Sequence, residues 1–121
     1  MAKIFLVDDS KFMRNIIADI LLKGGHTISG EASNGRDAVL NFNKISSDLI
    51  IIDFNLPDID GIETLRRIKK IDPYVKTIIF SSISHNNYKI ESYIAGASDY
   101  LVKPFDFYKL LDSVASVLRE R

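Results

Sequence analysis

Short apolar runs alternate along the chain with longer segments in which apolar residues recur every three or four positions. The runs are rich in Ile, Val and Phe, which is typical of strands, and the periodic segments are typical of helices that bury one face. Five strand and helix pairs fit this pattern. We therefore predict a single doubly wound α/β domain over residues 1–121, with a five-stranded parallel sheet and helices on both faces.

The predicted strands differ in how apolar they are. They cover residues 3–7, 28–32, 49–52, 77–80 and 99–102. The second is polar and contains Gly30, which favours an edge of the sheet, whereas the third is apolar on both faces and belongs in the middle. Helical periodicity places Val39, Phe42 and Ile45 on the second helix. It also predicts a fourth helix at 87–95.

The composition narrows the class of protein. Sixteen basic residues balance sixteen acidic ones, and there is no cysteine. Zero net charge gives no support for nucleic acid as a direct partner, and the lack of cysteine excludes disulfides and thiolate chemistry. No run approaches the ~18 uninterrupted apolar residues of a membrane span. We expect a cytoplasmic protein that does not insert into a membrane.

Four of the predicted strands end on charged or hydroxyl residues. These are Asp8 and Asp9 after the first strand, Asp53 after the third, Ser81 and Ser82 after the fourth, and Lys103 after the fifth. Because the carboxyl ends of parallel strands share one edge, where ligands bind in open α/β sheets, these side chains should meet. The sequence predicts a site assembled from distant positions.

The charges of this site suggest its chemistry. Each pair of like charges costs on the order of 4 kcal/mol at ~4 Å and an effective dielectric near 20. Lys103 supplies one compensating charge, and Mg²⁺, which prefers carboxylate oxygens, water and phosphate, could supply two more. A carboxylate could then attack phosphorus and form an acyl phosphate. Asp53 is the predicted acceptor because it ends the most apolar strand, and Asp8 and Asp9 are the predicted metal ligands.

Four strings occur in order at the predicted strand ends: VDDSKFMR, LIIIDFNLPDIDG, IIFSS and AGASDYLVKPF. Together they resemble a response regulator receiver domain, closest to the single-domain chemotaxis type, from residue 3 to about residue 118. The resemblance implies a flavodoxin-like fold with the strand order 2-1-3-4-5, of which the chemotaxis member is itself a standard example. It implies a domain that phosphorylates itself from a donor and slowly loses the phosphoryl group, rather than a turnover enzyme.

The resemblance also assigns the acceptor and the metal ligands. Asp53 matches the phosphoacceptor, which also contacts the metal. Asp8 and Asp9 match the acidic pair that binds Mg²⁺, with Mn²⁺ as the alternative ion. Asn55 matches the residue whose backbone carbonyl completes the metal shell.

Further matches concern the phosphate and the switch. Lys103 matches the lysine that contacts the phosphate, followed by a cis bond to Pro104. Ser81 matches the switch hydroxyl, and Tyr100 matches the switch aromatic, which we expect to turn inward when Ser81 moves. Ile83, like the Asn55 side chain, occupies a position where the family tunes the phosphoryl lifetime.

The resemblance implies two protein partners. One is a sensor histidine kinase, the phosphodonor, and the other is a downstream target that docks on residues 88–108 and the last helix. Half of the aromatic residues lie within 88–108, and aromatics are enriched in interfaces. We expect Phe107 to lie in the core, and Tyr88, Tyr93 and Tyr108 are the candidates for docking.

Other interpretations stay open. The chain could be the receiver of a longer regulator with an output domain, a phosphorelay intermediate, or a receiver outside chemotaxis. An aspartyl phosphohydrolase would need a second aspartate where Asn55 stands. Helix capping or loop solvation would explain any one of Asp8, Asp9 and Asp53. It explains poorly why all three occur at predicted strand ends. Asp58 and Asp60 are interpreted as turn and N-cap residues before the third helix, and His26 and His85 as isolated surface residues.

Overall fold

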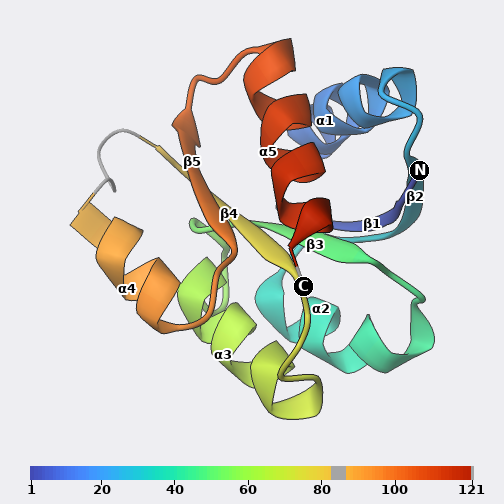
Figure 1. Ribbon diagram of the computed structural model, residues 1–121. Coiled ribbons are helices and arrows are strands. Elements are labelled where there is room, and N and C mark those ends of the chain that lie inside the picture. Colours follow the sequence, from blue (N-terminus) through green and yellow to red (C-terminus); the bar gives the residue numbers. More distant parts are fainter. Residues whose placement is uncertain (83–86, 121) are drawn as a thin grey trace.

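The computed structural model describes residues 1–82 and 87–120, so Ile83 and His85 lie outside the described residues. It contains the predicted five-stranded parallel sheet (Figure 1). The strands are β1 (Lys3–Val7), β2 (Thr27–Ala32), β3 (Leu49–Asp53), β4 (Thr77–Ser82) and β5 (Asp99–Lys103). Their order, β2-β1-β3-β4-β5, confirms the predicted order. The middle strand, β3, is buried along its whole length.

Helices cover both faces of the sheet. They are α1 (Lys11–Lys23), α2 (Gly35–Asn41), α3 (Gly61–Ile71), α4 (Lys89–Ile94) and α5 (Phe107–Arg119), with a 3₁₀ turn, η1 (Phe42–Lys44), after α2. One apolar cluster lies between the sheet and α1 and α5, and a second lies between the sheet and α2, α3 and α4 (Figure 1). In residues 1–82 and 87–120, no helix is long and apolar enough to cross a membrane.

Side-chain caps determine where four of the helices begin. The caps are Ser10, Asn34, Asp60 and Asp106, and each accepts a hydrogen bond from the backbone N–H three residues further on. Such a cap satisfies one of the backbone donors that the first turn leaves without a partner. The helices that follow β1 and β5 are therefore held close to the polar ends of those strands.

Three strands extend further at their carboxyl ends than the sequence predicted, and β2 begins one residue earlier, at Thr27. The ladder continues through the pairs Asp53 with Phe80 and Ser82 with Lys103, so these polar residues belong to the strands. A polar side chain does not interrupt the ladder as long as the neighbouring strand supplies backbone partners. The backbone of Asp53 and Lys103 is consequently fixed by the sheet itself.

The second predicted helix is shorter than expected. It ends at Asn41, and Ile45 follows η1 instead of lying on the helix. The reason lies on the edge strand, where a Cβ at Gly30 would come within 2.6 Å of Ile45 Cδ1. Ile45 thus packs over the glycine from the loop.

Two smaller predictions are also corrected. The fourth helix begins at Lys89 rather than at residue 87, because a 3₁₀ turn precedes it. His26 is half-buried rather than on the surface, and burial together with the nearby terminal amine lowers its pKa.

Candidate functional site

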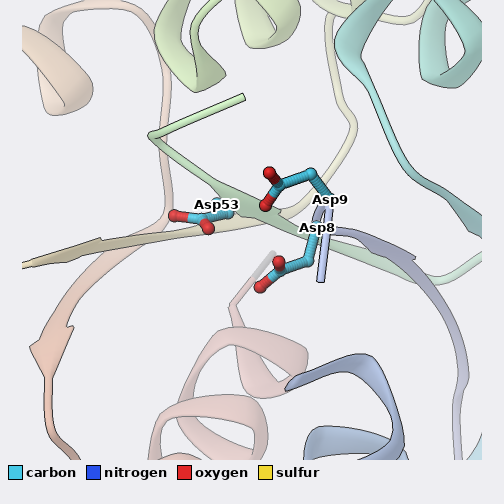
Figure 2. A group of neighbouring side chains, drawn as sticks. All are labelled: Asp8, Asp9 and Asp53. Carbon is cyan, nitrogen blue, oxygen red and sulfur yellow. The ribbon is translucent and has the colours of Figure 1, made fainter. Parts of the chain in front are cut away.

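Three aspartates meet at the carboxyl edge of the sheet, as the sequence predicted. One carboxylate oxygen of each of Asp8, Asp9 and Asp53 lies within 4.8 Å of the others. Figure 2 shows the three carboxyl groups close together at the ends of β1 and β3. Asp8 and Asp53 are only 3% and 6% exposed, whereas Asp9 is open to solvent. The site therefore has two buried carboxylates and one accessible carboxylate.

Asp8 is bound to the framework at three of its four polar atoms. Its backbone N–H donates to Ala32 O at 3.1 Å, its Oδ1 accepts from the Ser10 N–H at 2.9 Å, and its backbone O accepts from the Arg14 guanidinium. The fourth atom, Oδ2, is buried and has no hydrogen-bond partner among the described residues. This oxygen is the part of Asp8 that is left for a ligand.

The surroundings of Asp8 also shift its titration. Burial raises the pKa of the Asp8 carboxyl above its ordinary value, and the charges of Asp53 and Asp9 add to this effect. The Ser10 N–H and the Lys103 ammonium act in the opposite direction, without cancelling the rise. Burial, which ranks ahead of charge repulsion, is therefore the main reason that an ionised Asp8 is costly here.

Lys103 joins the two buried carboxylates. It reaches from β5 past β4, and its Nζ lies 3.1 Å from Asp53 Oδ2 and 3.8 Å from Asp8 Oδ2. The other oxygen of Asp53, Oδ1, accepts the Asn55 N–H at 3.2 Å. Both oxygens of Asp53 thus face donors, and its carboxyl plane is fixed. The expected cis bond between Lys103 and Pro104 is present.

The donor set fits a hard divalent cation. Three carboxylates face one ammonium, so two negative charges stay uncompensated when all three are ionised. A buried acceptor without a donor, such as Asp8 Oδ2, is costly unless something binds it. Mg²⁺ takes oxygen ligands of this kind, so Asp8, Asp9 and Asp53 could hold it. The Asn55 backbone carbonyl as a further ligand stays a prediction.

The loop after Asp53 is closed by its backbone. The Phe54 N–H donates to Phe80 O at 2.7 Å, and the Gly61 N–H donates to Phe54 O at 2.8 Å. A Cβ at Gly61 would lie 2.5 Å from Asp53 O and 2.8 Å from Phe54 Cα. Only glycine lets the start of α3 approach the end of β3 so closely, and this approach keeps the loop over the site.

Asp58 lies in the turn before α3, as predicted, and also binds the start of α2. Its carboxylate accepts the N–H groups of Gly35 and Arg36 at 2.9 Å and that of Ile59, in its own loop, at 2.7 Å. Burial alone would raise the pKa of Asp58, but these backbone donors lower it below the ordinary value. Asp60 is the cap of α3, as predicted. Asp58 therefore ties the loop beside the site to α2.

Both predicted switch residues are buried. Ser81 is fully buried, and its Oγ donates to Ser82 O at 3.2 Å. Tyr100 is 5% exposed and packs in the cluster under α2, α3 and α4. The Tyr100 ring thus occupies an inward position in this structure, and the expected inward turn on phosphorylation stays a prediction. The switch roles of both residues stay predictions.

The docking aromatics differ in exposure. Tyr108 is 74% exposed, and Tyr93 is partly exposed with its hydroxyl donating to Asp99 Oδ1 at 3.1 Å. Tyr88 is half-buried, and its ring stacks on Phe54 with the centroids 4.5 Å apart. Tyr88 thus belongs partly to the core, while Tyr108 is available at the surface.

The prediction that Phe107 lies in the core is wrong. Phe107 is only half-buried, and its ring meets Tyr108 edge-on. Phe105 packs against Phe80 instead, with the centroids 4.6 Å apart. The reason is that Asp106 caps α5, so the first residue of the helix lies at the rim of the sheet and the residue before the cap points inward.

Comparison with known proteins agrees with this geometry. A family model described as the response regulator receiver domain matches residues 4–115. Over 115 residues the chain is 36% identical to the chemotaxis protein CheY of Thermotoga maritima, covering 95% of this chain and 96% of that protein. Over 116 residues it is 39% identical to the chemotaxis protein CheY of Bacillus subtilis, covering 96% and 97%. A chain in the crystal structure of the CheX-CheY-BeF3-Mg complex from Borrelia burgdorferi superposes with a TM-score of 0.88 at 30% identity, covering 98% of this chain and 90% of that one.

Proposed function

The chain belongs to the response regulator receiver domain family, and on that premise we propose that Asp53 accepts a phosphoryl group from a phosphohistidine of a sensor kinase. The observation that supports this proposal is the arrangement around Asp53. Its carboxylate is fixed by Lys103 and by the Asn55 N–H, and two further carboxylates lie within 4.8 Å. A site with this charge needs a cation, and with one it suits a phosphoryl group.

Phosphoryl transfer to Asp53 would use side chains that already lie at the site. A carboxylate oxygen of Asp53 attacks phosphorus, the bond between phosphorus and the donor nitrogen breaks, and the histidine leaves. Lys103 Nζ, already 3.1 Å from Asp53 Oδ2, is close enough to contact a phosphoryl oxygen. Asp8, Asp9 and Asp53 would hold Mg²⁺, which would neutralise charge at the phosphoryl oxygens when bound. Slow hydrolysis of the acyl phosphate then resets a signalling domain that is not a turnover enzyme.

Ser81 would report the modification. A phosphoryl group brings roughly 1.5 to 2 negative charges, and the Ser81 hydroxyl would leave Ser82 O to donate to it. A charge-assisted hydrogen bond is worth about 1.5 to 3 kcal/mol, whereas moving a population from 1:99 to 99:1 requires about 5.5 kcal/mol. We therefore expect phosphorylation to shift the population in part and a bound target to complete the shift. Because Tyr100 is already inward, the shift would begin at Ser81.

A downstream protein would dock on the face formed by α4, β5 and α5. Ile90 and Ile94 on α4 and Tyr108 on α5 are each more than 70% exposed, so each offers an apolar side chain that a bound partner could cover. The two relatives named chemotaxis protein CheY favour chemotaxis as the pathway. The cytoplasmic location and the extent of one domain over residues 1–121 stay predictions.

Intact mass after incubation with acetyl phosphate and Mg²⁺ tests the proposal. We expect wild type to gain one phosphoryl group and Asp53→Asn to gain none. Asp60→Asn is the matched control, because it removes an exposed carboxylate of the same loop and keeps a side chain that can cap α3. The absence of any adduct on wild type with Mg²⁺ or Mn²⁺ would contradict the proposal.

A further inference from the structure

The string that contributes Asp8 and Asp9 ends with Arg14, and we propose that Arg14 is a positioning residue for these two carboxylates as ligands of Mg²⁺. The inference rests on the proposed function of the site. Arg14 lies one turn into α1, and its side chain is only 12% exposed. Its Nη1 donates to the backbone O of Asp8, and its Nε donates to Glu31 Oε1 at 2.8 Å. Arg14 therefore acts on the site through the backbone.

The oxygen that Arg14 holds belongs to the peptide unit between Asp8 and Asp9. A peptide unit is planar, so holding its oxygen restricts the direction of the chain at both aspartates. The neighbouring polar atoms of Asp8 are bound to Ala32 and Ser10. Arg14 supplies the remaining framework contact and leaves Asp8 Oδ2 alone directed to the site.

Glu31 holds Arg14 in turn. The carboxylate lies on β2, so one guanidinium joins α1, the end of β1 and the edge strand. A guanidinium presents several N–H donors in a rigid plane and can bind two acceptors in fixed directions. A lysine ammonium carries the same charge on a flexible stem without that plane. Arg14→Lys therefore removes the geometry and keeps the charge.

Charge alone predicts the opposite effect of a substitution. Arg14 is positive and repels a cation, so an Arg14 that acted only through its charge would weaken Mg²⁺ binding. Its removal would then tighten binding, and Arg14→Lys would change nothing. A positioning role predicts weaker binding in both variants. The sign of the change separates the two explanations.

Calorimetric titration of the full chain with MgCl₂ measures this directly. We expect the Kd for Mg²⁺ to rise about 10-fold in Arg14→Lys and Arg14→Met, the lower end of the usual loss for groups that orient metal ligands. Glu31→Gln should give a smaller rise in Kd. Arg66→Lys is the matched control, because Arg66 pairs with Glu63 and Glu91 on the surface of α3 and α4. It should leave the Kd unchanged.

Two further readouts keep the result interpretable. Thermal melts show whether each variant is folded, and amide shifts of Asp8 and Asp9 in metal-free buffer should change in Arg14→Lys but not in Arg66→Lys. If Arg14→Met does not fold, the Kd values of Arg14→Lys and Glu31→Gln test the positioning role. An unchanged or lower Kd for Mg²⁺ in Arg14→Lys would overturn the inference about Arg14. The proposed function would still stand if wild type takes a phosphoryl group. Wild type that binds no Mg²⁺ would instead overturn the proposed function.

Discussion

Replacing Asp8 with asparagine should raise the free energy of unfolding in metal-free buffer near pH 7. Asp8 is 3% exposed, and its Oδ2 has no hydrogen-bond partner in the described part of the chain. Asparagine keeps an oxygen that can accept the Ser10 N–H, as Oδ1 does now at 2.9 Å. The substitution therefore removes a buried charge and little else.

The magnitude follows from the distances around Asp8. At an effective dielectric near 20, Coulomb's law gives at least about 3.5 kcal/mol of repulsion from Asp53, whose oxygen lies within 4.8 Å, and about 4.4 kcal/mol of attraction to Lys103 at 3.8 Å. These terms nearly cancel, which leaves the several kcal/mol that burial of an ion costs. The Ser10 N–H offsets about 1.5 to 3 kcal/mol of that cost. We expect a net gain on the order of 1 to 2 kcal/mol, or roughly 4 to 8 °C in Tm.

The stability advantage of Asp8→Asn should depend on pH. Burial raises the pKa of Asp8, so the folded state keeps a proton that the unfolded chain has already lost. Stability of the wild type therefore falls as pH rises from the ordinary value of 3.8 to the raised folded pKa, and this effect is constant at higher pH. The advantage of Asp8→Asn should grow through that window and then level off.

Urea unfolding followed by circular dichroism, with EDTA present, measures the difference in free energy of unfolding between wild type and Asp8→Asn. Asp9→Asn is the control, because it makes the same change in the same cluster at an exposed position. It should have little effect. Added MgCl₂ should reduce the advantage of Asp8→Asn, because binding to the folded state stabilises the wild type more. Asp8→Asn that is no more stable than wild type at pH 7 would refute the reasoning, and an equal gain in Asp9→Asn would attribute the effect to net charge.

Three further predictions concern contacts in and near the loop beside the site. Gly61→Ala should destabilise the fold by about 1 to 3 kcal/mol, because its Cβ would lie 2.5 Å from Asp53 O; an unchanged urea midpoint would contradict that contact. Asp58→Ala should cost about 1 kcal/mol, the usual effect of a lost cap. The folded pKa of Asp58 is lowered, so its contribution to the free energy of unfolding is present above the ordinary value of 3.8 and is lost as pH falls through the folded pKa. Urea unfolding of wild type and Asp58→Ala at several pH values checks this. Tyr88→Ala should lower Tm through its lost ring stack, whereas Tyr108→Ala, at a 74% exposed residue, should not; equal losses would argue against this assignment.

The composition of the site could be predicted because chain direction determines it. In a parallel sheet every strand ends on the same edge, so a polar residue after each apolar run is placed without any knowledge of contacts. Asp8, Asp9 and Asp53 follow two such runs, and their oxygens do meet within 4.8 Å. The same reasoning placed Lys103 beside them, and its Nζ lies 3.1 Å from Asp53 Oδ2.

Element boundaries were harder to predict because periodicity describes side chains and not backbone partners. The last residues of β3 and β5, Asp53 and Lys103, stay in the ladder although their side chains are charged. Phe107 has the helical spacing of a core residue, but Phe105, on the other side of the cap, packs on Phe80. In each case a neighbouring strand or a cap, rather than the local pattern, decides the outcome.

Arg14 and Asp58 show why the supporting contacts escaped prediction. Each binds backbone atoms of a different element: Arg14 binds the carbonyl of Asp8, and Asp58 binds the N–H groups at the start of α2. Every residue carries such backbone groups, so no pairing of residue types marks the contact in the sequence. Which backbone a long side chain reaches depends on the strand order and on where each helix begins. The residues that carry chemistry are therefore recognisable by type, whereas the residues that hold the geometry are recognisable only by position, and Arg14→Lys separates the two because it changes geometry at constant charge.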